Sequence, residues 1–313
     1  MAMPMVKFND GRMFPAFGLG TWQSKPGEVE QAVKDAIIAG YRHIDGAHVY
    51  ENEQEVGAAL SEVMKQGVVK REDLYITSKL WCTYHQPDMV EGAIKTTLKN
   101  LGLEYLDLYL VHWPQGFKEG DVLFPRENDK IIYSDVDYID TWKAMEALVD
   151  KGLAKSIGVS NFNKSQLDRL LGVAKIKPVT NQVEVHPYLN QQKLADYCSS
   201  LDIVITAYSP LGSPGTPRSK PEDIPLLENS LLKEIADKYN KSVPQLLIRY
   251  AIDRGMIVIP KSVTKSRIIH NMEVFHFKLT SDDMGRIGAL DKNGRFCTMG
   301  DIDHKYYPFK EEF

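Results

Sequence analysis

Short apolar runs alternate with longer amphipathic stretches along most of the chain. Three successive runs begin at residues 41, 73 and 105, a constant spacing of 32 residues. That length holds one strand, one helix and two turns. The pattern therefore predicts repeated strand–helix units, which build a parallel sheet.

Eight such strands can be placed along the sequence. They are expected at residues 17–20, 41–45, 73–79, 105–111, 154–160, 179–185, 202–209 and 256–260. Eight parallel strands close a barrel, so we expect an α/β fold of the (β/α)8 TIM-barrel type, formed by residues 1–313 as one domain. The alternative is an open doubly wound sheet, but its GxGxxG fingerprint stops here after Gly18 and Gly20.

Helices are expected between these strands and are punctuated by capping glycines. The clearest lie at residues 28–39, 52–65, 87–101 and 139–151, and another begins at about residue 264. Before the first strand, the segment VKFNDGRMFPAF predicts an N-terminal β-hairpin that turns at Asn9, Asp10 and Gly11. Two long connections, 112–138 and 210–228, and the tail 292–313 are expected to overhang the C-terminal face of the barrel.

Composition narrows the classes of function. The net charge of −4 gives no electrostatic footprint for nucleic acid or for an anionic membrane, so neither is expected as a partner. Three widely spaced cysteines favour neither a disulfide framework nor a zinc site, and we expect no bound metal. No secretory signal or apolar span is recognisable. We therefore expect a cytoplasmic protein, with a monomer as the default.

Four ionisable residues fall at or just beyond the ends of predicted strands, where a barrel collects its catalytic groups. Asp45 would pair with Lys79, and the ammonium would hydrogen-bond Tyr50 and lower the pKa of its phenol. His112 would lie across the mouth as an orienting donor or a second acid. The quartet is suited to giving a proton to an oxygen. The structural alternative is an ordinary ion pair beside a half-buried aromatic ring.

Two further histidines near Asp45 form the pattern HxDxxH and raise the possibility of a metal site. On a strand, His43 shares a face with Asp45, whereas His48 lies beyond the strand end. We therefore interpret His43 as a core histidine and His48 as a loop histidine.

Two more clusters of polar residues follow predicted strands. Residues 259–267 contain cations and hydroxyls in a strand-to-helix turn, where backbone N–H groups favour a phosphate. A solvated basic turn is the alternative. The second cluster follows or ends the fifth, sixth and seventh predicted strands and consists of Ser160, Asn161, Gln182, Tyr208 and Ser209. Their side-chain amides could hold a carboxamide, and the ring of Tyr208 could stack on a flat heterocycle such as nicotinamide.

These residues and motifs resemble the aldo-keto reductase family, particularly its aldose and aldehyde reductase branch. The resemblance covers nearly the whole chain and is carried by GLGTW (18–22), GYRHIDGAHVYENEQEVG (40–57), SKLW (78–81), DLYLVHWP (107–114), GVSNF (158–162), NQVEVHPY (181–188), AYSPLGS (207–213), IPKSVTKSR (259–267) and YPF (307–309). It implies a (β/α)8 barrel that binds NADPH or NADP+ and acts on a small carbonyl substrate.

The resemblance also assigns roles by position. It places the catalytic tetrad on Asp45, Tyr50, Lys79 and His112. It places cofactor contacts on Thr21, Trp22, Asp45, Ser160, Asn161, Gln182, Tyr208, Ser209, Leu211, Ser213, Lys261, Ser262, Val263, Thr264, Arg267 and Asn271. It places the substrate pocket on Trp22, Val49, Tyr50, Trp81, His112, Trp113, Phe117, Phe124 and Cys297.

Several positions depart from the family pattern. Gly46 replaces the usual Cys or Ser after the tetrad aspartate, and His270 replaces the Glu found in many members before the adenine-contacting Asn271. Arg218 and Gly294 each replace a tryptophan at the rim of the pocket. Because the rim differs while the tetrad is intact, the resemblance specifies the reaction better than the substrate.

The main hypothesis is NADPH-dependent reduction of aldehydes and ketones, with Tyr50 as general acid. Sugar aldehydes, lipid-derived aldehydes and steroid or ecdysteroid ketones all stay open as substrates. The alternatives are an NADPH-binding redox sensor with little turnover and a lens- or scaffold-type structural protein. An isomerase or aldolase on a similar barrel is disfavoured, because a paired Lys79 is unlike a desolvated Schiff-base amine.

Overall fold

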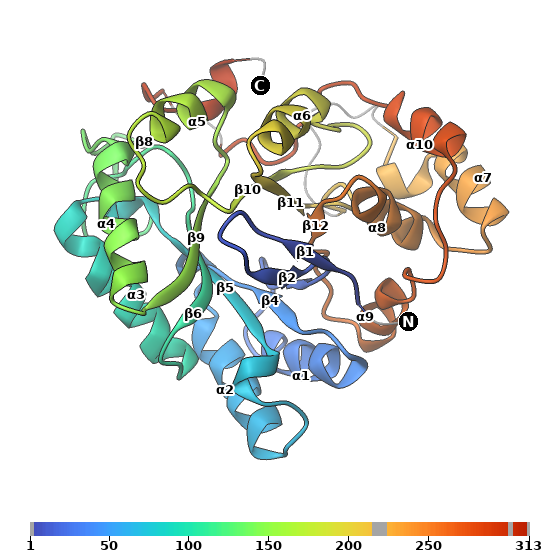
Figure 1. The fold of residues 1–313 in the computed structure, drawn as a ribbon, viewed down its shortest axis with the longest axis horizontal. Helices are drawn as coiled ribbons and strands as arrows, with labels where there is room; N and C mark the ends of the chain where they lie inside the picture. The colour runs from blue at the N-terminus through green and yellow to red at the C-terminus, as the bar shows by residue number, and fades with distance from the viewer. Residues whose placement is uncertain (1–2, 215–223, 300–302, 312–313) are drawn as a thin grey trace.

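Eight short parallel strands form the centre of the molecule in the computed structural model, which describes residues 3–214, 224–299 and 303–311 (Figure 1). The strands are β3 (Leu19–Gly20), β4 (His43–Asp45), β5 (Tyr75–Leu80), β6 (Leu106–Val111), β9 (Ala154–Ser160), β10 (Thr180–Glu184), β11 (Val204–Tyr208) and β12 (Ile257–Val258). Their order is β12-β11-β10-β9-β6-β5-β4-β3. Seven of the eight lie within the predicted strands and β5 extends one residue beyond its prediction, to Leu80, so the predicted strand order is confirmed.

Backbone hydrogen bonds between the two ends of this order close the sheet into a barrel. The Gly18 N–H donates to the Val258 carbonyl at 3.0 Å, and the Gly20 N–H donates to the Pro260 carbonyl at 3.1 Å. Isolated parallel bridges join Phe17 to Val258 and Gly20 to Lys261. The predicted (β/α)8 barrel is therefore confirmed, and the open-sheet alternative is wrong.

Burial explains why the strands read as unbroken apolar runs. All six residues of β6 and all five residues of β10 are buried. One face of each strand points into the barrel and the other packs under the helices, as is typical of parallel sheets. Polar residues within these strands, such as Gln182 and Glu184, are therefore exceptions that require hydrogen-bond partners.

Ten α-helices in the described part of the chain surround the strands (Figure 1). They are α1 (Val29–Ala39), α2 (Glu53–Lys65), α3 (Pro87–Leu101), α4 (Tyr138–Asp150), α5 (Lys164–Leu171), α6 (Gln192–Ser200), α7 (Ser230–Lys238), α8 (Val243–Asp253), α9 (Lys265–Met272) and α10 (Ser281–Gly288). The five helices that the sequence places explicitly begin within one residue of their predicted starts. Their termini carry readable signals, such as Gly40 in the left-handed conformation after α1 and Pro87 at the start of α3.

The predicted N-terminal hairpin is present and closes the bottom of the barrel. Its strands are β1 (Met5–Lys7) and β2 (Met13–Pro15), and they cross the barrel centre in Figure 1. Phe8 and Phe14 stack at 4.9 Å and pack against Leu108, Leu110 and other apolar side chains of the barrel interior. The opposite, C-terminal end of the barrel is the end left for a site.

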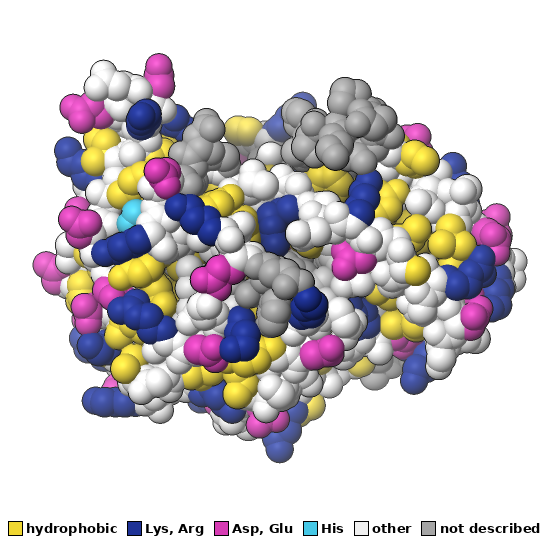
Figure 2. Space-filling model, turned by 90° about the horizontal axis from the view of Figure 1, so that it is seen from above, with side chains coloured by type: hydrophobic (Ala, Val, Ile, Leu, Met, Phe, Trp, Pro, Cys, Tyr) yellow, Lys and Arg dark blue, Asp and Glu magenta, His cyan; other side chains and the backbone are white. Residues whose placement is uncertain are grey.

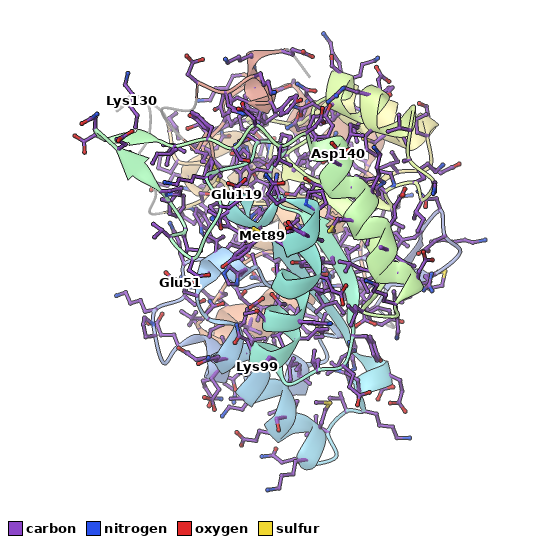
Figure 3. The ribbon with its side chains drawn as sticks, turned by 90° about the vertical axis from the view of Figure 1, so that its left-hand side faces the viewer. Glu51, Met89, Lys99, Glu119, Lys130 and Asp140 are labelled. Atoms are coloured by element: carbon purple, nitrogen blue, oxygen red, sulfur yellow. The ribbon has the colours of Figure 1, made fainter. Side chains whose placement is uncertain are left out.

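The described parts of the three long segments lie at that C-terminal end, as expected, while residues 215–223 of the second lie outside the described residues. The connection 112–138 contains a small hairpin that the sequence did not reveal, formed by β7 (Arg126–Glu127) and β8 (Lys130–Ile131). Lys130 marks the end of this hairpin, which projects away from the barrel (Figure 3). Arg218, one of the predicted departures from the family pattern, lies outside the described residues. The tail returns over the barrel and includes the short turn η5 (Pro308–Lys310).

On the face shown in Figure 2, Lys and Arg side chains are interspersed with Asp and Glu. No helix in the described part of the chain is long and apolar enough to cross a membrane.

The contact between α2 and α3 gives a prediction that separates packing from helix propensity. A Cβ on Gly57 would lie 2.6 Å from the backbone oxygen of Asn100, whereas a Cβ on Gly92 would meet nothing within 4 Å. Both glycines lie inside helices, where alanine is intrinsically favoured by about 1 kcal/mol. We expect Gly57→Ala to destabilise the protein by about 1–3 kcal/mol and Gly92→Ala to stabilise it by up to about 1 kcal/mol. Urea unfolding measures both changes, and stabilisation by both substitutions would contradict the packing described here.

Candidate active site

A cavity of about 1270 Å³ opens where the C-terminal ends of the barrel strands meet. Every residue that the sequence predicted for cofactor or substrate binding lines it, from Thr21 and Trp22 to Asn271 and Cys297. Asp45, Tyr50 and His112 of the predicted tetrad also line it, and Lys79 lies fully buried behind them. The structure thus brings all of the predicted site residues together.

The side chains of Asp45, Lys79 and Tyr50 form a continuous chain of polar contacts. Lys79 Nζ donates to Asp45 Oδ1 at 2.6 Å and to the Gly46 carbonyl at 2.8 Å. It also lies 3.3 Å from the Tyr50 hydroxyl. The predicted Asp–Lys–Tyr arrangement is therefore present in the structure.

Strand register explains how these groups meet. β4 and β5 are parallel neighbours, with Asp45 opposite Thr77. Because side chains alternate along a strand, Thr77 and Lys79 share one face, and Lys79 projects beyond the end of β4 toward Asp45. Tyr50 then returns to this point on a short 3₁₀ turn, His48–Tyr50, directly after β4.

Burial and neighbouring charges shift the pKa values of Tyr50 and Lys79 in opposite directions. Burial raises the pKa of Tyr50, and the Lys79 ammonium only partly offsets that rise. Burial alone would lower the pKa of Lys79, but Asp45 and Tyr50 outweigh it and the pKa is raised. The Lys79 ammonium lowers the pKa of the phenol as expected, but burial outweighs it and the net pKa is raised, because the sequence showed the neighbouring charge but not the depth of burial. At neutral pH the phenol keeps its proton beside a charged ammonium.

His112 follows β6 and faces the same cavity from the other side of Tyr50. The two ring centroids are 5.9 Å apart, and the ring of Trp81 lies 5.3 Å from His112. Burial, together with the charges of Lys79 and His85, lowers the pKa of His112 well below its ordinary value. The imidazole is thus neutral at neutral pH, which fits an orienting hydrogen-bond donor and disfavours the alternative role of second acid.

The predicted carboxamide site is an ordered group of amides and hydroxyls. Asn161 adopts a left-handed backbone conformation, with φ of 62°, and donates through Nδ2 to the His112 carbonyl at 3.0 Å. Tyr208 donates its hydroxyl hydrogen to Asn161 Oδ1 at 2.8 Å, which fixes the tyrosine beside the cavity. Gln182 donates through Nε2 to Asp45 Oδ2 at 2.8 Å. This last contact links the carboxamide site directly to the Asp–Lys pair.

The predicted phosphate site lies at the start of α9. Lys261, Ser262, Val263, Thr264 and Arg267 all line the cavity there. Thr264 precedes the helix without a side-chain cap, so backbone N–H groups of the first turn can serve an anion. Lys265 lies in the same segment but pairs with Asp35 at 3.2 Å and does not line the cavity.

Aromatic and aliphatic side chains form the other end of the cavity, where the sequence predicted the substrate pocket. Trp81, Trp113 and Phe117 are buried, whereas Trp22 and Phe124 stand 39% and 45% exposed at the mouth. The Trp81 indole donates to the Leu123 carbonyl at 2.7 Å, which holds the connection 112–138 against the barrel. The wall is therefore apolar and is anchored by specific polar contacts.

The two histidines of the HxDxxH pattern lie in different surroundings. His43 is buried, its Nε2 lies 3.1 Å from Thr77 Oγ1, and burial lowers its pKa to about 4. His48 lies in the turn beyond β4, with Nδ1 4.0 Å from Glu53. Among the described residues, no three His, Cys, Asp or Glu side chains are grouped as a metal site requires.

Three departures from the family pattern can be placed. A Cβ on Gly46 would make only ordinary contacts, the nearest at 3.5 Å, so a larger residue is not excluded there by space. His270 and Asn271 both line the cavity near Arg267, so that end of the cavity has two polar side chains. Gly294 does not line the cavity; its N–H donates to the Tyr188 carbonyl at 2.8 Å.

Several lining residues were not predicted. Arg126 and Ile131 come from the β7–β8 hairpin, and Phe296, Thr298 and Met299 come from the tail. Both segments were expected over this face of the barrel, but neither carries a periodic pattern, so the sequence offered no signal for these particular side chains. Glu184 does not line the cavity but accepts from the Phe296 and Cys297 N–H groups of the tail. It was also missed, although its place two residues after Gln182 on the same strand could have indicated an inward-facing carboxylate.

Comparisons with known proteins agree on one family. The sequence model of the Aldo/keto reductase family matches residues 16–292. The chain is 49% identical over 320 residues to aldo-keto reductase family 1 member A1 of Gallus gallus, covering 98% of each protein. It is 48% identical over 316 residues to estradiol 17 beta-dehydrogenase 5 of Mus musculus, again covering 98% of each. The structure is similar to that of an aldose reductase from Schistosoma japonicum, with a TM-score of 0.94 and 46% identity over 99% of this chain and 100% of that one.

The buried Asp45–Lys79 pair gives a stability prediction. Lys79→Met would leave the Asp45 carboxylate buried without its countercharge, and breaking such a pair costs about 3–5 kcal/mol. The double variant Asp45→Asn, Lys79→Met removes both charges, so we expect it to recover most of that loss. Urea unfolding of both single variants and the double variant measures this coupling. Additive losses would show that the pair does not act as a unit.

Proposed function

The chain belongs to the aldo/keto reductase family, and from this premise we propose that it reduces aldehydes and ketones to alcohols with NADPH, Tyr50 giving the proton. The observation that carries the proposal is the position of the Tyr50 hydroxyl, 3.3 Å from a buried Lys79 that Asp45 holds in turn. Membership of the family makes the protein an oxidoreductase. NADPH and the acid role of Tyr50 are the further steps proposed.

The residues around the cavity fit a dinucleotide phosphate. Lys261 and Arg267 line one end, beside the uncapped start of α9, and would hold a 2′-phosphate. Ser160, Asn161 and Gln182 offer amide and hydroxyl groups suited to a carboxamide, and Tyr208 offers a flat ring. Ser209, Leu211 and Ser213, with Ser213 Oγ 2.8 Å from Ser209 Oγ, would border the pyrophosphate. When bound, NADPH supplies the hydride.

Tyr50 would act while the substrate carbonyl oxygen lies between it and His112. The phenol proton moves to that oxygen as the carbonyl carbon is reduced, and a phenolate is left beside Lys79. The ammonium favours that phenolate, because an opposite charge stabilises the ionised form. Neutral His112 can donate a hydrogen bond to the same oxygen, which orients the carbonyl without supplying the proton.

The apolar wall supports small carbonyl compounds with hydrophobic groups as substrates. Trp81, Trp113 and Phe117 would exclude water, which strengthens the electrostatic contacts made at the carbonyl. The names of the relatives point to both aldehydes and steroids, and each of these classes belongs in a substrate panel. We further propose a monomer working in the cytoplasm; all three cysteines are unpaired, as is usual in a reducing compartment.

The proton-donor role predicts the effect of removing one hydroxyl. We expect Tyr50→Phe to lower kcat for an aromatic aldehyde by about 10²–10⁴-fold, the usual contribution of a general acid, while the Kd for NADPH changes little. Tyr84→Phe is the matched control, because Tyr84 bonds Asp121 outside the cavity and should retain full activity. Wild-type turnover by Tyr50→Phe would refute the role.

The same assay separates the enzyme from a redox sensor with little turnover. Steady-state oxidation of NADPH by the wild-type protein with any member of an aldehyde and ketone panel supports the enzyme. Tight NADPH binding without turnover across the panel would favour the sensor.

Cofactor preference follows from the cations near α9. Arg267→Ala removes a charge that would pair with the 2′-phosphate, so we expect the Kd for NADPH to rise about 10–100-fold while that for NADH changes little. Lys265→Ala is the control, since Lys265 pairs with Asp35 away from the cavity. Fluorescence titration measures these affinities, and equal wild-type affinities for the two cofactors would contradict the proposed preference.

A further inference from the structure

A buried carboxylate connects the barrel to the tail. Glu184 ends β10 and is 0% exposed. Its Oε1 accepts from the Phe296 N–H at 2.8 Å and lies 2.8 Å from His186 Nε2, and its Oε2 accepts from the Cys297 N–H at 2.9 Å. A carboxylate withdrawn from water requires such donors. The tail N–H groups therefore stabilise the buried Glu184 carboxylate, and the carboxylate in turn holds the tail in place.

The segment that Glu184 holds forms one side of the substrate end. We call Phe296, Cys297, Thr298 and Met299 the tail wall, because all four line the cavity. From outside, the Tyr307 hydroxyl donates to the Thr298 carbonyl at 2.6 Å. From inside, Glu184 supplies the acceptors for two consecutive backbone N–H groups. The tail wall is therefore fixed from both sides by specific hydrogen bonds.

Strand alternation places Glu184 on the same face of β10 as Gln182. Gln182 donates to Asp45 at the reaction centre, so one strand positions both the proton relay and the tail wall. Glu184 also lies opposite Tyr208 in the parallel register of β10 and β11. A displacement of the tail wall would thus occur next to the reacting groups.

We propose that Glu184 is a positioning residue that fixes the tail wall and thereby sets which carbonyl compounds fit the cavity. Its part in substrate choice depends on the proposed function, whereas its part in holding the tail does not. The residue makes no contact with the proton relay itself, so its loss should change selectivity more than the chemical step.

The test of selectivity uses Glu184→Gln, which keeps the shape of the side chain. An amide has only one acceptor oxygen, so at least one of the two tail N–H groups loses its acceptor. That N–H group would then face the NH2 group of the glutamine, and two donors cannot bond each other. We expect kcat/KM for a bulky apolar ketone to fall about tenfold relative to that for a small aldehyde, mainly through KM. Asp283→Asn is the control, because Asp283 is an equally buried carboxylate in α10 that does not line the cavity.

Cys297 provides a second measurement that needs no catalytic turnover. Burial raises the pKa of its thiol to about 12, with Glu184 adding to the rise, so it should react slowly with 5,5′-dithiobis(2-nitrobenzoate). Cys82 and Cys198 are both 0% exposed, and Cys297→Ser identifies the signal that comes from the tail wall. Release of the tail wall should make labelling of Cys297 faster, whether or not the protein reduces carbonyl compounds.

A second variant separates movement of the tail wall from loss of charge. Glu184→Asp keeps the carboxylate but is one methylene shorter, so it cannot reach both N–H groups. We expect faster labelling of Cys297 in both Glu184 variants and wild-type labelling in Asp283→Asn. Wild-type labelling in Glu184→Asp would overturn the anchoring of the tail wall. Faster labelling with an unchanged substrate ratio would overturn the role in selectivity.

Discussion

A fully buried ammonium is the constraint from which the site follows. Lys79 is 0% exposed, and an unpaired charge at that depth would cost several kcal/mol. Its compensation comes from the Asp45 carboxylate and the Gly46 carbonyl, both at the end of the neighbouring strand. The register of β4 and β5 therefore matters both for stability and for the arrangement of the site. The same ammonium, once compensated, stands beside the Tyr50 hydroxyl.

The second oxygen of Asp45 explains why a closed barrel is needed. It accepts from Gln182, which lies on β10, and β10 is separated from β4 by three strands in the sheet order. In an open sheet those strands would lie far apart, whereas in a closed barrel their inward side chains meet across the interior. Closure between Gly18 and Val258 is thus part of what holds the Asp–Lys pair in place.

Sequence reasoning succeeded where periodicity or a strand end determined the answer. The spacing of apolar runs located all eight strands, and the ends of those strands located Asp45, Lys79 and Gln182. It failed where the answer depended on depth or on irregular backbone. Burial, which no sequence pattern measures, reversed the expected direction of the pKa of Tyr50. The resemblance placed Phe124 and Cys297 in the pocket, but the β7–β8 hairpin and the tail carry no repeat. The lining side chains Arg126, Ile131, Phe296, Thr298 and Met299 could therefore be found only in three dimensions.

The two ends of the cavity differ in the interactions they can offer: charged groups line one end and apolar side chains the other. Among the described lining residues Asp45 is the one acidic side chain, and Lys79 neutralises it, so Lys261 and Arg267 dominate the field at the end near α9. Under the proposed function, phosphate recognition at that end would be electrostatic and would depend on groups attached to the barrel. At the other end the walls are apolar, so selection depends on shape. The shape of this end is set by the connection 112–138 and the tail. Both segments can change without disturbing the barrel. An anchor such as Glu184 would then hold a changed tail wall against the same strand, β10.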